Sequence, residues 1–94
     1  MSQSCELTVR LPADLHARPA GQMVQAVANF DASIVVAFGP READARSVLA
    51  VMGLGATADG DVTLRASGPD AEQAVAAVAL LLGALGEAQT QPSR

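Results

Sequence analysis

The chain has 94 residues, of which 50% are hydrophobic, 17% charged and 2% aromatic, and its formal net charge is -4. A chain of this length builds one modest core, so we expect a single domain over residues 1–94. One histidine and one cysteine leave no intrachain disulfide and too few ligands for a zinc site, so we expect no metal, and the acidic balance argues against nucleic acid as a partner.

The first two predicted elements are an alternating strand and an amphipathic helix. Apolar and polar residues alternate over 6–11, which is the period of a half-buried strand, and Pro12 ends it. The apolar side of this strand consists of Leu7, Val9 and Leu11. From Pro19 the apolar positions follow a helical spacing as far as Phe30, where polar neighbours end the helix.

The middle of the chain predicts two strands and a very short helix. Residues 33–38 alternate and are rich in β-branched side chains, and a Gly-Pro turn leads into a weak strand over 41–45. Ser47 then stands at the N-cap position of a helix of less than two turns over 48–52, with glycines beyond its end.

The last part of the chain predicts a strand and a long helix. After a turn at 59–61, residues 62–67 alternate, and Gly68-Pro69-Asp70 starts a helix with one apolar stripe. The stripe consists of Ala71, Ala74, Val75, Val78, Leu81, Leu82 and Leu85. We expect residues 86–94 to form a flexible polar tail.

This order of elements predicts an α+β fold. Four short strands with one apolar face imply an open-faced two-layer sandwich, in which helices cover one face of a mostly antiparallel four-stranded sheet and water covers the other. The most apolar run, 74–85, is too short to cross a bilayer, so we expect a core helix and no membrane insertion. The polar start of the chain lacks the apolar core of a signal peptide, which favours a cytoplasmic protein.

The segment Leu15-His16-Ala17-Arg18-Pro19-Ala20 brings together three groups suited to phosphate chemistry. A neutral imidazole such as that of His16 is a competent nucleophile near neutral pH. The N-terminus of the following helix offers unpaired N–H groups and the positive end of the helix dipole. Arg18 can bond phosphate oxygens in a bidentate manner. The segment therefore suits a phosphoryl carrier, although a lone loop histidine beside an arginine is more often an exposed or capping pair.

Two segments, in this order of elements, resemble the histidine-containing phosphocarrier (HPr) family of the bacterial sugar phosphotransferase system over roughly 5–85. Residues 15–20 resemble its phosphorylation motif, and the segment from Arg46 to Gly55 resembles its regulatory serine segment. The resemblance implies that His16 accepts a phosphoryl group on Nδ1 from phosphorylated enzyme I and passes it to a histidine of a IIA domain. Arg18 matches the family's active-site arginine.

The resemblance also implies what kind of protein this is. The chain is expected to be a carrier with a transient phosphohistidine rather than an enzyme that turns over a substrate alone, and to need no cofactor. A monomer is expected, because a shuttle presents one face to several partners in turn.

Apolar residues around the motif are candidates for the docking surface. They are Ala17, Ala20, Gly21 and Val24 on the first helix and Val48, Leu49 and Met52 on the short helix. Because so short a helix has only one or two inward positions, at least one of its apolar side chains must face solvent. The alternative is that the three residues of the short helix all pack in the core.

Ser47 has two compatible roles. As an N-cap it satisfies orphan N–H groups, which is worth about 1 kcal/mol. In many members of the family the matching serine is phosphorylated by an HPr kinase/phosphorylase, so the resemblance makes Ser47 a candidate regulatory site. A phosphate there would be tolerated at a helix N-terminus, yet it would place negative charge beside the docking surface.

Two residues depart from the family's usual pattern. Asp14 stands where the family usually has glycine, and its carboxylate would favour imidazolium and repel an attached phosphoryl group if it lay beside His16. A side chain that points away would close a turn instead. Gly21 costs about 1 kcal/mol of helix propensity relative to alanine and leaves room for a partner's side chain. Any basic rim around His16 must rest on Arg18 and Arg46.

Two other functions remain open from the sequence. One is a regulatory docking module with the same fold, and the other is a carrier that serves a nitrogen-regulatory or dihydroxyacetone phosphotransfer branch. The presence of both His16 and Arg18 favours a carrier.

Overall fold

The computed structural model describes residues 4–84, which form four strands and three helices in the predicted order. The strands are β1 (Ser4–Arg10), β2 (Ser33–Phe38), β3 (Arg41–Asp44) and β4 (Asp61–Ser67). The helices are α1 (Ala17–Val27), α2 (Val48–Met52) and α3 (Ala71–Gly83). The predicted α+β sandwich is therefore confirmed.

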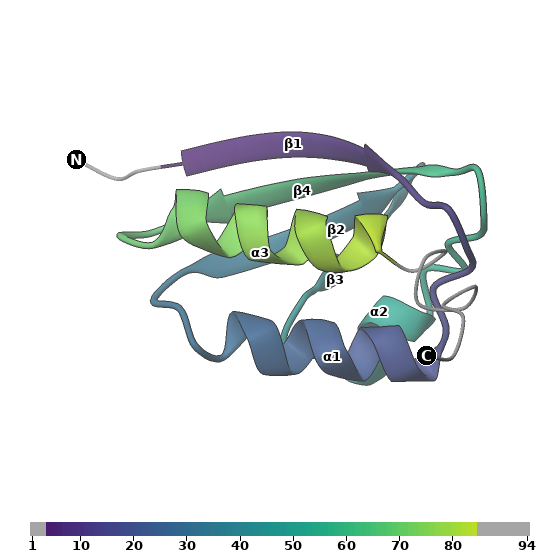
Figure 1. Ribbon diagram of the computed structural model, residues 1–94, viewed down its shortest axis with the longest axis horizontal. Helices are drawn as coiled ribbons and strands as arrows, with labels where there is room; N and C mark the ends of the chain where they lie inside the picture. The colour runs from purple at the N-terminus through teal and green to yellow at the C-terminus, as the bar shows by residue number, and fades with distance from the viewer. Residues whose placement is uncertain (1–3, 85–94) are drawn as a thin grey trace, which may run out of the picture.

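The four strands form one sheet in the order β1-β4-β2-β3, and each neighbouring pair is antiparallel. Leu64 of β4 lies opposite Leu7 of β1 on one side and Val36 of β2 on the other, so β4 is central. Figure 1 shows α1 and α3 on the same side of the sheet, with α2 beside α1. Helix α3 contacts β1, β4 and β2, whereas α2 contacts β3.

The core lies between the sheet and the helices. Alternate residues of β2 and β4 are buried, as the two-residue period of a strand requires. The opposite face of the sheet carries exposed polar side chains, among them Thr8, whose hydroxyl lies 3.1 Å from that of Thr63, and Arg65, which pairs with Glu42. The prediction that this face meets water is confirmed.

Helix α1 differs from the prediction at both ends. It begins at Ala17, two residues before Pro19, because His16 takes the N-cap position. It ends at Val27, and Phe30 lies in the turn that follows, where its N–H donates to the carbonyl of Val27 at 3.0 Å. Phe30 nevertheless packs against the core, which explains why its position fitted the helical spacing.

The apolar side of β1 is less covered than the alternation implied. Leu7 faces the helical layer but remains 43% exposed, because β1 is an edge strand with a sheet neighbour on one side only. The weak strand β3 ends at Asp44, one residue short of the prediction, although Ala45 N–H still donates to the carbonyl of Ile34 at 2.9 Å.

Helix α3 is the predicted core helix. Five residues of its stripe are buried, namely Ala71, Ala74, Val75, Val78 and Leu82, while Leu81 is half-buried. The last predicted residue of the stripe, Leu85, and the predicted tail over 86–94 lie outside the described residues. None of the helices within 4–84 is long and apolar enough to cross a membrane.

The turn before α3 contacts the loop after α1. The Oδ2 atom of Asp70 accepts a hydrogen bond from the N–H of Asp31 at 2.7 Å, so this carboxylate joins two loops instead of capping its own helix. Gly68 approaches the same loop with a φ of 120°, and a Cβ there would lie 2.9 Å from the carbonyl oxygen of Asp31. Glycine is therefore required at this turn.

Candidate functional site

His16 lies at the end of the connection between β1 and α1, at the N-cap of the helix. Its backbone is extended, with φ of -87° and ψ of -174°, and its carbonyl accepts the N–H of Ala20 at 3.0 Å. Its imidazole makes no cap hydrogen bond and is exposed to solvent. The ring nitrogens are thus accessible to a partner protein at the positive end of a helix dipole.

Arg18 lies in the first turn of α1 and is exposed. Among residues 4–84, no ion pair engages its guanidinium, and the first turn contains no acidic residue. The guanidinium and the N–H groups of the first turn are therefore available to an anion beside the imidazole of His16.

The carboxylate of Asp14 is hydrogen-bonded to the segment 56–60. The Oδ1 atom accepts a hydrogen bond from the N–H of Ala58 at 2.7 Å, and the N–H of the next residue, Leu15, donates to the carbonyl of Ala56 at 3.1 Å. The side chain therefore does not close a turn within its own connection, one of the two placements open from the sequence, but bonds a segment that lies 44 residues away along the chain.

The segment 56–60 supports the connection that carries His16, a role that no pattern in the sequence indicates. It bonds the start of the connection as well, because the N–H of Leu11 donates to Gly60 at 2.8 Å and the N–H of Asp59 donates to the carbonyl of Leu11 at 2.7 Å. The visible signal in the sequence was a turn at 59–61, which does not reveal its tertiary partner.

Helix α2 presents the second part of the site. The hydroxyl of Ser47 accepts the N–H of Ala50 at 3.2 Å, so the predicted N-cap is confirmed. Val51 is buried and anchors the helix, whereas Leu49 is 82% and Met52 is 41% exposed. Val48 is half-buried and packs against the core.

Helices α1 and α2 lie side by side, with α2 beside the N-terminal half of α1 (Figure 1). Of the residues predicted on α1, Ala17 is exposed, and Gly21 and Val24 are half-buried. The prediction was wrong for Ala20, which is fully buried because its position on the helix faces the core. We name the remaining accessible apolar residues the docking patch: Ala17, Gly21, Val24, Val48, Leu49 and Met52.

Arg46 does not contribute to a basic rim around His16. Its guanidinium donates to the carbonyls of Phe30 at 3.5 Å and Ala32 at 2.9 Å, which lie in the loop after α1. These hydrogen bonds join the turn before α2 to the loop that follows α1. Of the two arginines expected to form a basic rim, Arg18 is therefore the one that lies beside His16 in the chain, in the first turn of α1.

The N-cap of α2 gives a testable stability effect. Replacing Ser47 with alanine should lower the free energy of unfolding by about 1 kcal/mol, because the N–H of Ala50 loses its acceptor. Urea denaturation followed by circular dichroism measures this change. As a control, Ser67→Ala alters an exposed serine at the end of β4 and should have a smaller effect; equal losses in the two variants would contradict the capping role.

Within the described part of the chain, no three His, Cys, Asp or Glu side chains gather in a way that could hold a metal ion. The site consists instead of one imidazole, one guanidinium, a helix N-terminus and the docking patch. This set can exchange an anionic group with a partner that docks over it.

Comparison with known proteins gives consistent results. Residues 3–84 match the family model described as PTS HPr component phosphorylation site. The phosphocarrier protein HPr of Lysinibacillus sphaericus is 39% identical over 84 residues, which cover 89% of this chain and 96% of that protein. The crystal structure of HPr from Bacillus anthracis str. Ames superposes with a TM-score of 0.79 at 28% identity, covering 84% of this chain and 96% of that one. The crystal structure of HPr-C-His from Thermoanaerobacter tengcongensis superposes with a TM-score of 0.76 at 29% identity, and the superposition covers 90% of this chain and 96% of that one.

Proposed function

This chain belongs to the family of the PTS HPr component, and we propose that His16 is the residue through which it carries a phosphoryl group. Its function is that of a phosphocarrier in the phosphotransferase system. The observation that supports His16 is its exposed imidazole at the start of α1, two residues before the exposed Arg18, whose guanidinium forms no ion pair within residues 4–84.

The transfer exchanges one phosphorus–nitrogen bond for another. A ring nitrogen of His16 attacks the phosphorus of a phosphohistidine on the donor, the new bond forms, and the donor imidazole leaves. Arg18 and the N–H groups of the first turn of α1 compensate the phosphoryl charge. The two bonds are nearly equal in energy, so the protein supplies position and charge compensation rather than a deep pocket.

We propose phosphorylated enzyme I as the donor and the IIA domain of a sugar transporter as the acceptor. Both would bind over His16 on the docking patch, whose exposed Leu49 and Met52 offer apolar contact next to the reacting group. A monomer in the cytoplasm suits this exchange, because the same face must meet two partners in turn.

Ser47 supports a regulatory role for α2. A phosphate placed on its hydroxyl by an HPr kinase/phosphorylase would sit at the start of α2 and bring two negative charges beside Leu49. Docking through this patch would then be weakened without unfolding the helix.

The experiment that tests the function is phosphorylation by enzyme I and phosphoenolpyruvate. Intact-mass measurement should show one added phosphoryl group that is lost in acid, as expected for a phosphohistidine. A protein whose mass does not change, although the same enzyme I phosphorylates a known HPr, would contradict the proposal.

Arg18 gives a second test of the site. Arg18→Ala should lower the rate of transfer from enzyme I about tenfold, because one charge-assisted hydrogen bond to the phosphoryl group is lost. Stopped-flow or rapid-quench measurement gives this rate. The matched control is Arg65→Ala, which removes an exposed arginine from the open face of the sheet and should leave transfer unchanged; a slow control would show that net charge, not this contact, matters.

A further inference from the structure

We propose that Asp14 is a positioning residue for phosphoryl transfer: its carboxylate clamps the connection before α1 onto the segment 56–60 and so fixes where His16 stands. The inference rests on the proposed function of His16 and adds a residue that supports it without touching the phosphoryl group. The observation behind it is the 2.7 Å hydrogen bond from the N–H of Ala58 to Oδ1 of Asp14.

The backbone is held on both sides of His16. Before it, Asp14 is bound through its side chain, and Leu15 is bound through its N–H to Ala56 and through its buried side chain to the core. After it, the carbonyl of His16 accepts the N–H of Ala20 and begins α1. Within residues 4–84 the imidazole makes no cap hydrogen bond, so the position of the reacting ring depends on these backbone anchors.

The segment that receives the clamp is itself well fixed. The N–H of Gly60 donates to the carbonyl of Thr57 at 3.0 Å, and Leu11 bonds both Asp59 and Gly60. The ring of Phe38 packs against this turn so closely that a Cβ on Gly60 would lie 2.6 Å from its Cε1 atom. A carboxylate attached to a rigid turn restrains the loop it belongs to.

The hydrogen bond to Ala58 also restrains the negatively charged carboxylate of Asp14. Along the extended connection Leu11, Ala13 and Leu15 are buried, whereas Pro12, Asp14 and His16 are exposed. Asp14 and His16 therefore emerge on the same side of the connection, two residues apart. The hydrogen bond from the N–H of Ala58 holds Oδ1 of this carboxylate and so limits where its negative charge can lie relative to a phosphoryl group on His16.

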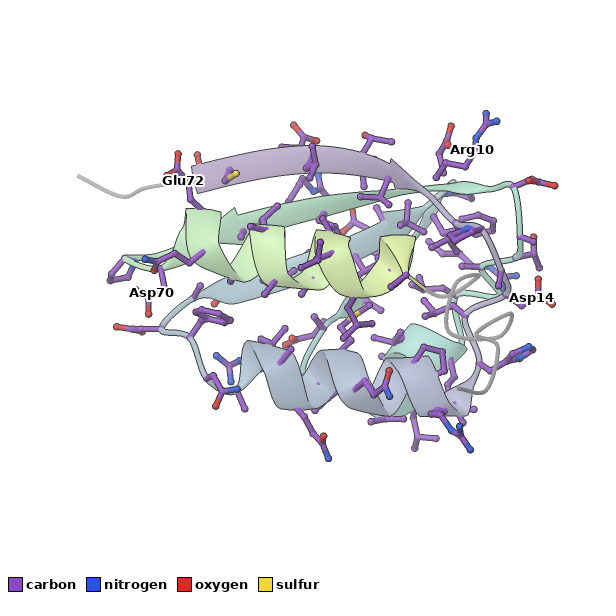
Figure 2. The ribbon with its side chains drawn as sticks, in the orientation of Figure 1. Arg10, Asp14, Asp70 and Glu72 are labelled. Carbon is purple, nitrogen blue, oxygen red and sulfur yellow. The ribbon has the colours of Figure 1, made fainter. Side chains whose placement is uncertain are left out.

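The chain offers a matched control for the loss of such a bond. Asp70 also accepts a backbone N–H at 2.7 Å, that of Asp31, and it also joins two loops. Figure 2 shows Asp14 and Asp70 at opposite ends of the molecule. Asp70→Ala therefore removes an equivalent carboxylate–backbone hydrogen bond far from His16.

The test compares rates of phosphoryl transfer from phosphorylated enzyme I at saturating concentration, at a temperature where each variant is folded by circular dichroism. Asp14→Ala should be about tenfold slower than the parent, because one restraining hydrogen bond is lost. Asp14→Asn keeps an oxygen acceptor and should stay within about twofold of the parent. Asp70→Ala should transfer at the parental rate.

A second measurement reports the clamp directly. The amide of Ala58 should exchange with solvent faster in Asp14→Ala than in the parent or in Asp14→Asn. If Asp14→Ala does not fold, Asp14→Glu replaces it, because the longer side chain keeps the charge but displaces the acceptor and should also slow transfer.

The outcomes separate this inference from the proposed function. A parent protein that takes up no phosphoryl group overturns both. With an active parent, the positioning role is overturned if Asp14→Ala transfers at the parental rate, if Asp14→Asn is as slow as Asp14→Ala, or if Asp70→Ala is slowed equally.

Discussion

The variant His16→Ala should take up no phosphoryl group from enzyme I and phosphoenolpyruvate. His16 is the only histidine of the chain, and alanine offers no nitrogen that could form the phosphorus–nitrogen bond. The fold should remain, because the imidazole is exposed and makes no cap hydrogen bond. The free energy of unfolding should therefore change by less than about 0.5 kcal/mol. Intact-mass measurement and a thermal melt test the two expectations together.

Gln22→Ala is the control for this experiment, since it alters an exposed residue of the same helix, α1, and should be phosphorylated like the parent. An acid-labile phosphoryl group on His16→Ala would show that another residue is the acceptor and would overturn the assignment.

The variant Leu49→Asp should lower kcat/KM for transfer from enzyme I about a hundredfold, since exposed apolar side chains at the centre of an interface contribute most to binding and a buried unpaired carboxylate opposes it. Leu49 is 82% exposed, so its substitution does not disturb the core, and an acidic residue in the first turn of α2 suits the helix dipole. The loss should appear mainly in KM, measured from the dependence of the rate on the concentration of the carrier.

The matched control for Leu49 is Leu80→Asp. Leu80 is 78% exposed on α3, a different helix, and its substitution introduces the same charge. We expect a parental kcat/KM for this variant. If the two variants lose the same activity, the effect comes from added charge or lost hydrophobicity in general, and the docking patch is misplaced.

Much of the fold could be predicted because short-range patterns decide it. The alternation over 33–38 coincides with β2, and the serine before the apolar run over 48–52 marks the start of α2. Helix ends were harder: His16 extends α1 at its start, and Phe30 keeps the apolar spacing after the helix has ended at Val27. A side chain in a turn, such as Phe30, can match the spacing of the preceding helix, because the spacing reflects contact with the core and not the helical backbone itself.

The candidate site was predictable in its chemistry but not in its surroundings. The order of residues 15–20 already places an imidazole, an arginine and a helix N-terminus together. The order of residues does not reveal that Ala20 is buried. It also does not reveal that Arg46 binds backbone carbonyls at the far end of α1. The first fact depends on which face of α1 meets the core, and the second on how the turn before α2 packs against the loop after α1.

The seven elements, the open face of the sheet and a motif suited to phosphate follow from the order of residues alone, because each depends on periodicity or on residues next to one another. The strand order β1-β4-β2-β3 and the partner of Asp14 follow only from how the elements pack in three dimensions, since Ala58, which bonds Asp14, lies 44 residues away along the chain. Such contacts join segments that are distant along the chain, and no local pattern encodes them.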